Sequence, residues 1–230
     1  MTSALDLDRQ PLTEETPAPP TLRSREVIGG VCLILVPIGW ALGEILTPPS
    51  GSTSSSMLRE YAAHRGTGVA AGAVSLVTLL VFLPAFFALV SPITARGRRW
   101  GHAGLAALVY STITIAMLVG INMMFQAMTA PGLDRSAMVH AVDQLLKNPL
   151  GLPVLAGHWI MGLGVVFIGV AVVRSGRYAA WAGYAIILWF VTDFLAEMLP
   201  IGDVAGSLVS NAFGLAGLGS IGLAMLRKRH

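Results

Sequence analysis

Residues 69–90, VAAGAVSLVTLLVFLPAFFALV, are the stretch that decides the fold of this chain. The stretch contains no ionisable side chain, and it is longer than the about 20 apolar residues with which a helix crosses ~30 Å of hydrocarbon. Hydrocarbon offers no water to a backbone N–H or C=O, so each of these groups must be bonded within the segment. A helix satisfies its own backbone in this way. The sequence therefore predicts a transmembrane helix from Val69 to Val90.

Five further apolar runs extend this prediction to the rest of the chain. They are Val27–Leu46, Gly104–Met128, Pro153–Val173, Tyr178–Pro200 and Val204–Leu226. None of them shows the short alternating segments that are typical of a transmembrane β-barrel. The sequence thus predicts an all-α fold class, a polytopic membrane protein with a six-transmembrane-helix bundle.

The composition agrees with a lipid environment. Hydrophobic residues make up 54% of the chain and charged residues 12%, with a mean hydropathy of +0.71. A soluble domain carries about 25% charged residues, so this chain has too few for a water-facing surface. The single cysteine, Cys32, permits neither an internal disulfide nor a cysteine-based metal site.

The basic residues predict which way the bundle faces, because cytoplasmic loops carry an excess of Lys and Arg. Most of the 15 Lys and Arg residues lie on one side, at Arg9, Arg23, Arg25, Arg96, Arg98, Arg99, Arg174, Arg177, Arg227, Lys228 and Arg229. The others, Arg59, Arg65, Arg135 and Lys147, lie in two longer connections on the opposite side. We therefore expect a multi-pass protein of the inner (plasma) membrane of a bacterium, with its N-terminus and C-terminus in the cytoplasm.

This placement of charge also predicts the partners and the limits of the domain. Arginines beside anionic headgroups account for the pI near 9.4, so we expect membrane lipids as partners and no nucleic acid. The segment 1–26 is rich in proline and has no apolar run, which predicts a disordered cytoplasmic tail. The transmembrane domain then covers 27–226, and 227–230 is a basic cytoplasmic tail.

Both longer connections contain a short amphipathic segment, which we expect to be a helix on the outer side. In the first, Ser56–His64 follows the proline turn of Thr47–Gly51 and places Met57, Leu58 and Tyr61 on one face. In the second, the apolar residues Met138, Val142, Leu145 and Leu146 recur at helical spacing. Such helices either lie in the headgroup plane or cap the bundle, and capping is the more ordinary arrangement.

Small residues at four-residue spacing predict where helices pack closely. They occur as Gly39 and Gly43, as Gly68 and Gly72, and as Ala212, Ala216, Ser220 and Ala224. A six-helix bundle needs several such contacts within one chain, so intramolecular packing is expected. The alternative is a homo-oligomer or a membrane-protein partner.

Polar side chains gather at one depth of the predicted bundle. Odd-numbered helices run outward and even-numbered helices inward at about 1.5 Å per residue, which assigns each side chain a depth. Five of the six helices place a polar group in one outer layer, namely Glu44, Asn122, Gln126, His158, Asp193, Glu197 and Asn211. We expect these residues to line an outward-facing pocket that binds a proton, a cation or a small polar or lipid ligand.

Asp193 and Glu197 are the most informative pair in this layer. They are four residues apart, so their carboxylates project from the same helix face. A charge in hydrocarbon costs ~3 kcal/mol or more, so one of them should bind a proton, a cation or the basic neighbour His158. Alternatively, Glu44 and Glu197 reach interfacial water, His158 is a satisfied core residue, and the amides only bridge helices.

The sequence carries no motif of a known catalytic or cofactor site. It lacks HExxH, the Gly-x-Ser-x-Gly turn, a P-loop and a dinucleotide fingerprint. We therefore expect no metal and no cofactor, assign no catalytic residue, and leave open whether the protein is an enzyme.

Three segments carry a resemblance to a known group of proteins. They are Thr47-Pro48-Pro49-Ser50-Gly51, then Leu58-Arg59-Glu60-Tyr61-Ala62-Ala63-His64-Arg65, and the basic Arg96-Gly97-Arg98-Arg99-Trp100-Gly101-His102. With the six apolar runs, they resemble the uncharacterised six-helix integral membrane proteins common in actinobacteria. The resemblance implies the fold and the membrane location, and no activity.

Three functional hypotheses follow from the polar layer. The first is a binding or transport protein with Asp193, Glu197 and His158 at its centre. The second is an accessory or structural membrane subunit whose polar layer only packs helices. The third, ranked last, is a membrane-embedded lipid-modifying enzyme with an acidic residue and His158 as general acid and base.

Overall fold

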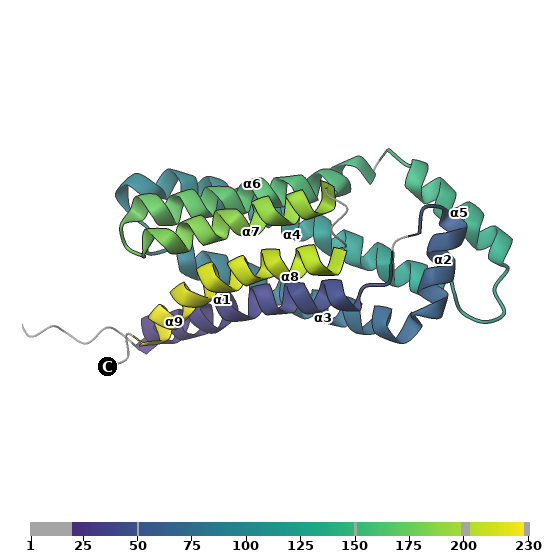
Figure 1. Cartoon of the computed structure of the whole chain (residues 1–230), viewed down its shortest axis with the longest axis horizontal. Helices are drawn as coiled ribbons and strands as arrows, with labels where there is room; N and C mark the ends of the chain where they lie inside the picture. Colours follow the sequence, from purple (N-terminus) through teal and green to yellow (C-terminus); the bar gives the residue numbers. More distant parts are fainter. Residues whose placement is uncertain (1–19, 50, 150, 199–202, 228–230) are drawn as a thin grey trace, which may run out of the picture.

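A computed structural model of the chain describes residues 20–49, 51–149, 151–198 and 203–227. Within these ranges every regular element is a helix (Figure 1). The elements are α1 (Pro20–Leu46), α2 (Ser54–Ala63), α3 (Arg65–Val90), the 3₁₀ turn η1 (Ala95–Gly97), α4 (Arg98–Ala127), α5 (Arg135–Lys147), α6 (Gly151–Ser175), α7 (Ala180–Met198), α8 (Asp203–Gly214), the π-helical stretch η2 (Leu215–Gly219) and α9 (Ser220–Arg227). The predicted all-helical class is confirmed.

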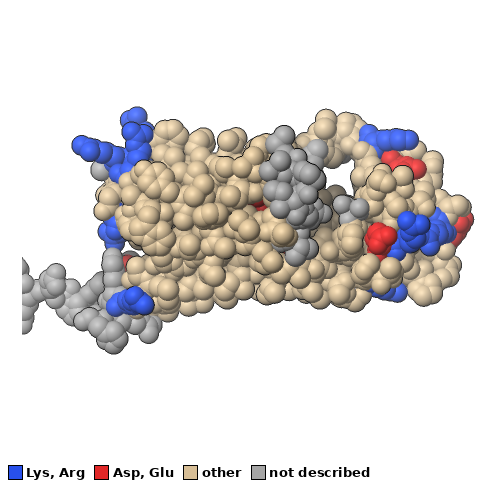
Figure 2. All heavy atoms as spheres, viewed as in Figure 1, with Lys and Arg blue, Asp and Glu red and all other residues tan. Residues whose placement is uncertain are grey.

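Several of these helices have the length and composition of membrane spans. Five are long and apolar enough, at Ser24–Leu46, Arg65–Val90, Arg98–Ala127, Gly151–Ser175 and Ala205–Arg227, and the apolar part of α7 is shorter, at Ala180–Ala196. The long helices run side by side, and charged side chains gather at the two ends of the elongated molecule (Figures 1 and 2). The face between the ends is mostly uncharged (Figure 2). A membrane protein fits this distribution.

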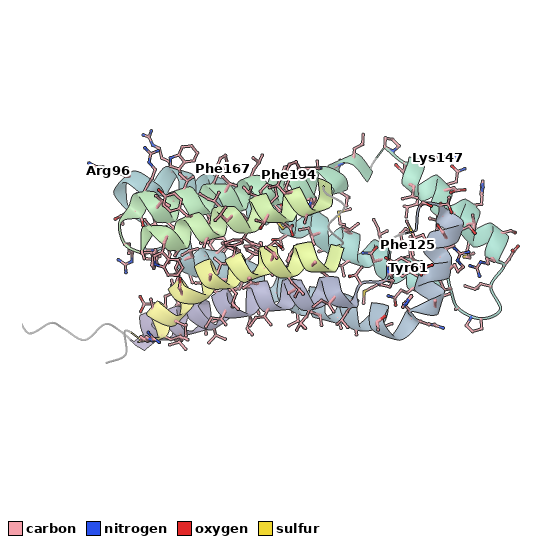
Figure 3. All side chains as sticks on the ribbon, in the orientation of Figure 1. Tyr61, Arg96, Phe125, Lys147, Phe167 and Phe194 are labelled. Carbon is pink, nitrogen blue, oxygen red and sulfur yellow. The ribbon has the colours of Figure 1, made fainter. Side chains whose placement is uncertain are left out.

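The two ends of the bundle differ. At one end α1 begins and α9 ends, and Arg96 lies at the same end (Figures 1 and 3); we call it the basic end. At the other end α2 and α5 stand beyond the rest of the bundle, and we call it the loop-helix end.

One predicted boundary needs correction. The helix predicted from Val27 begins at Pro20, so part of the segment 1–26 is helical and not a disordered tail; residues 1–19 lie outside the described part of the chain. Proline is tolerated at the first position of a helix because that N–H needs no intrahelical partner. The run predicted as one helix from Val204 to Leu226 is one continuous helical span, Ala205–Arg227, in which the π-helical stretch η2 lies between α8 and α9.

The core lies between α1, α3, α4, α6, α7 and the segment formed by η2 and α9. Its largest fully buried side chains include Phe82 and Phe86 of α3, Leu108 of α4 and Ile168 of α6. The pairs α1 with α3, α4 with α6, α6 with α7, and α7 with α8 pack side by side. Glycines permit the closest approaches, because a Cβ on Gly222 of α9 would lie 2.5 Å from the Gly30 carbonyl oxygen of α1.

The predicted alanine stripe does not pack in this way. Ala212, Ala216 and Ala224 are exposed, whereas Gly214 and Gly217 on another face of the same helical segment are buried. A Cβ on Gly217 would lie 2.8 Å from the carbonyl oxygen of Ala182 in α7. The expectation that this alanine stripe packs within the chain is therefore wrong.

The two amphipathic helices are present and cover one another. Leu58 and Tyr61 of α2 and Val142 of α5 are buried against Phe125 at the end of α4. The rings of Tyr61 and Phe125 meet edge to face, with centroids 5.9 Å apart (Figure 3). The centre of each apolar face is thus buried within the protein, whereas Leu146 of α5 is exposed, and the position of both helices on the outer side stays a prediction.

Candidate functional site

The structure brings three of the predicted site residues together between α1, α7 and α8. These are Glu44, Asp193 and Asn211, and two serines of α8, Ser207 and Ser210, join them. The Ser207 hydroxyl donates to the Glu44 carboxylate, and the Ser210 hydroxyl lies 3.0 Å from Oδ1 of Asp193. We call these five residues the serine cluster.

The cluster arises from the spacing of polar residues on α8. Ser207, Ser210 and Asn211 are three and four residues apart, so they share one helix face. That face meets α1 and α7, which supply Glu44 and Asp193. One turn of α8 therefore holds carboxyl groups from two other helices.

Asn211 carries the amide of the cluster and is buried. Its Nδ2 donates to the carbonyl oxygen of Ser207 at 2.9 Å and to its Oγ at 3.3 Å. A carbonyl oxygen only accepts, so this contact fixes which end of the amide is nitrogen. Its Oδ1 is buried and has no hydrogen-bond partner in the described structure. The cluster thus presents an acceptor to which a proton donor could bind.

The Ser210 hydroxyl has two hydrogen-bond acceptors within reach. Its Oγ lies 3.0 Å from Oδ1 of Asp193 and 3.0 Å from the backbone oxygen of Ser207. A hydroxyl has a single proton, so only one of these oxygens receives it at a time.

A narrow cavity reaches Asp193 from the interior of the bundle. Its volume is about 10 Å³, and its walls include Trp40 of α1, Phe82 of α3, Met161 of α6 and Trp189 of α7. A cavity needs roughly 10–15 Å³ to hold one water molecule. Asp193 therefore lies between the polar serine cluster and a small, largely aromatic cavity.

The two predicted amides of α4 belong to a different group of residues. Asn122 accepts a hydrogen bond of 3.0 Å from the Tyr61 hydroxyl of α2. Gln126 is buried against Gly68 of α3, where an added Cβ would lie 2.0 Å from its Nε2. Within the described residues, no hydrogen bond joins these amides to the serine cluster. We call Tyr61, Asn122 and Gln126 the amide cluster.

The amide cluster surrounds a second small cavity, of about 30 Å³. Thr47 and Pro48 after α1 line it together with Gly72 and Ser75 of α3. Burial raises the pKa of the Tyr61 phenol, so Tyr61 stays a hydrogen-bond donor over a wider pH range than an exposed tyrosine. This cavity is neutral in character, unlike the serine cluster.

His158 and Glu197 are the remaining predicted residues. His158 lies on α6 and is half-buried, and its ring meets Trp159 edge to face with centroids 6.0 Å apart. Trp159 in turn contacts Phe194 of α7. The side chain of Glu197 lies outside the described residues, so the pairing of Asp193 with Glu197 stays a prediction.

The described residues contain no group of three or more His, Cys, Asp or Glu side chains that could hold a metal ion. The polar layer predicted from the sequence includes neither Ser207 and Ser210 nor Tyr61. The signal for the serines was available, because a polar face Ser-x-x-Ser-Asn in an apolar helix is where a buried carboxylate would find donors.

Comparisons of this chain with protein-family models, curated proteins and solved structures find no match. The functional argument therefore depends on the geometry of the chain itself.

Proposed function

We propose that the chain is a six-span membrane protein in which α7 is the sixth span. Its apolar part, Ala180–Ala196, is short, but α7 packs between α6 and α8, and a bilayer adapts to a short span at modest cost. With an even number of antiparallel spans, the last span ends at the basic end, where the first span begins. By the excess of basic residues in cytoplasmic loops, this end faces the cytoplasm and α2 and α5 lie outside.

We further propose that the serine cluster takes up and releases a proton, as part of a binding or transport function. The observation that carries this proposal is that Ser207 and Ser210, on one turn of α8, hold carboxyl groups from α1 and α7. Carboxylates are costly within a largely apolar bundle, and protonation removes that cost.

The geometry offers a simple way to accommodate both charge states. When Asp193 is ionised, the Ser210 hydroxyl donates to it. When Asp193 is protonated, the same hydroxyl turns to the backbone oxygen of Ser207, which is equally close. Protonation also converts a carboxylate from a pure acceptor into a donor, which the buried Oδ1 of Asn211 can use.

The structural alternative rests on the same hydrogen bonds, which join α1 to α8 and α7 to α8. In that case the cluster only holds helices together, and its carboxyl groups keep one charge state.

The two functions are separated by infrared difference spectra of the full chain in lipid bilayers, recorded as the pH is lowered. We expect a protonated-carboxyl band that is reduced in the Asp193→Asn or Glu44→Gln variants. Glu60→Gln is the matched control, because Glu60 lies on α2 and bonds no residue of the cluster. Circular dichroism and gel filtration report whether each variant is folded.

Equal spectra for wild type, Asp193→Asn and Glu44→Gln would support the structural alternative instead. A band that disappears when sodium is added at constant pH would indicate that the cluster binds a metal cation in competition with the proton.

A further inference from the structure

A large cavity lies at the basic end, and it is lined by other residues than those of the serine cluster. It has a volume of about 640 Å³, within the ~300–1,000 Å³ of ordinary ligand pockets. The beginning of α1, the end of α3, the beginning of α7 and α9 surround it. We call it the basic groove.

The floor of the basic groove is apolar, and several of its side chains are alanines. Ala88 of α3, Ala182 of α7, and Ile221 and Ala224 of α9 line it. Ala182 and Ile221 are buried, while Ala224 is exposed to the groove. The alanine side chains are short, so they leave space between the neighbouring helices.

The rim of the groove is polar and carries net positive charge. Arg25 of α1 and Arg177, just before α7, both line it, with Glu26 as the acidic residue. Both arginines are exposed. Arginine is suited to phosphate, because its planar guanidinium can donate two parallel hydrogen bonds to it.

Two aromatic residues mark the height of the membrane surface at this groove. Tyr178 is half-buried and Trp181 is 54% exposed, and both line the groove. Trp and Tyr prefer the level of lipid headgroups. A second hollow of about 490 Å³, lined by Arg227, shares Ser220 and Ala224 with the groove, so the surface continues along α9.

We propose that the basic groove binds one anionic phospholipid. Its phosphate lies between Arg25 and Arg177, and one acyl chain follows the floor past Ala182 and Ala224. The charge of the rim selects an anionic headgroup, and the small side chains of the floor admit the chain. This site is separate from the serine cluster and does not depend on its proton binding.

The test is native mass spectrometry of the full-length chain, purified in detergent and incubated with phosphatidylglycerol or with phosphatidylcholine of the same acyl chains. We expect one tightly held phosphatidylglycerol. The double variant Arg25→Gln/Arg177→Gln should weaken its binding roughly tenfold or more. Arg98→Gln/Arg99→Gln is the matched control, because these exposed arginines of α4 carry the same charge at the same end without lining the groove.

A second pair of variants tests the shape of the floor without changing charge. Ala224→Trp fills the groove and should reduce phosphatidylglycerol binding severalfold. Ala216→Trp, on an exposed position of the same helical segment outside the groove, should leave it unchanged.

Equal binding of the two lipids, or equal losses in the groove variants and their controls, would overturn the proposal. Asp193→Asn should bind phosphatidylglycerol like the wild type, so failure here and failure of the proton-binding proposal are distinguishable.

Discussion

Asn211 links the chemistry of the two carboxyl groups at the level of single residues. Its amide nitrogen bonds Ser207, whose hydroxyl donates to Glu44, and Ser210 on the same face reaches Asp193. A buried acceptor without a donor costs ~1–3 kcal/mol. A donor that reaches Oδ1 removes this cost, and under the proposed proton binding that donor is a protonated carboxyl group of the cluster.

Tyr61 gives a prediction for pH dependence at the residue scale. Burial raises the pKa of its phenol, whereas the unfolded chain loses this proton near the ordinary value of about 10. The stability that Tyr61 contributes is therefore complete below about pH 10 and is lost as the pH rises through the higher pKa of the folded state. The Tyr61→Phe variant should lose less stability than wild type over that alkaline range, because it has no proton to release.

The measurement is the free energy of unfolding of the detergent-solubilised chain, below and above about pH 10. At neutral pH, Tyr61→Phe should be less stable by about 0.5–1.5 kcal/mol, because the hydrogen bond to Asn122 is lost. The exposed Tyr184 provides the control variant Tyr184→Phe. Identical alkaline behaviour of wild type and Tyr61→Phe would contradict the prediction.

At the scale of elements, glycines set the distance between α1 and α9. The Gly222→Ala variant places a methyl group 2.5 Å from the Gly30 backbone oxygen, which cannot move aside without moving α1. We expect it to destabilise the bundle by about 1–3 kcal/mol. Gly120→Ala is the matched control, because nothing lies within 4 Å of a Cβ there and alanine favours a helix. Thermal unfolding of both variants in detergent checks the difference.

The same elements show what a small-residue pattern can predict. Spacing identifies where a helix permits close approach, but it does not identify the partner or the face that is used. On the last membrane-length segment both an alanine face and a glycine face were available, and the glycines at 214 and 217 pack on α7 while the alanines stay exposed. Glycine permits the closer contact because backbone can meet backbone.

For the whole molecule, hydrophobic length was sufficient to predict the helical class and most helices. The long runs correspond to helices because hydrocarbon requires internal backbone bonding, whatever the tertiary packing. The apolar run begins at Val27, whereas α1 begins at Pro20. Residues 20–26 are mostly polar, so they do not extend the predicted membrane span, but polar residues can still form a helix. The π-helical stretch η2 within the last span was not predicted, because hydropathy does not distinguish a π-helix from an α-helix.

The candidate site was predicted only in part. The sequence predicts how deep each side chain lies in the bundle, but not which neighbouring helix that side chain faces. Glu44, Asp193 and Asn211 share a depth and meet on α8. Asn122 was assigned a similar depth, but its hydrogen bond goes to Tyr61 of α2. Which neighbour each face meets depends on the order of helices in the bundle, and hydropathy does not encode that order.

The orientation of the whole molecule is open to a direct test with a single introduced cysteine. The single native cysteine, Cys32, is buried in α1. A Cys32→Ala background removes its thiol, so that only the introduced cysteine can react. Ser52 before α2 and Thr94 before η1 are exposed at opposite ends of the bundle. In the proposed orientation, with the basic end in the cytoplasm, a membrane-impermeant maleimide added to intact cells should label Ser52→Cys and not Thr94→Cys. Thr94→Cys should react only after the membrane is permeabilised. The reverse pattern would place α2 and α5 in the cytoplasm, and the basic groove would then face the outer leaflet.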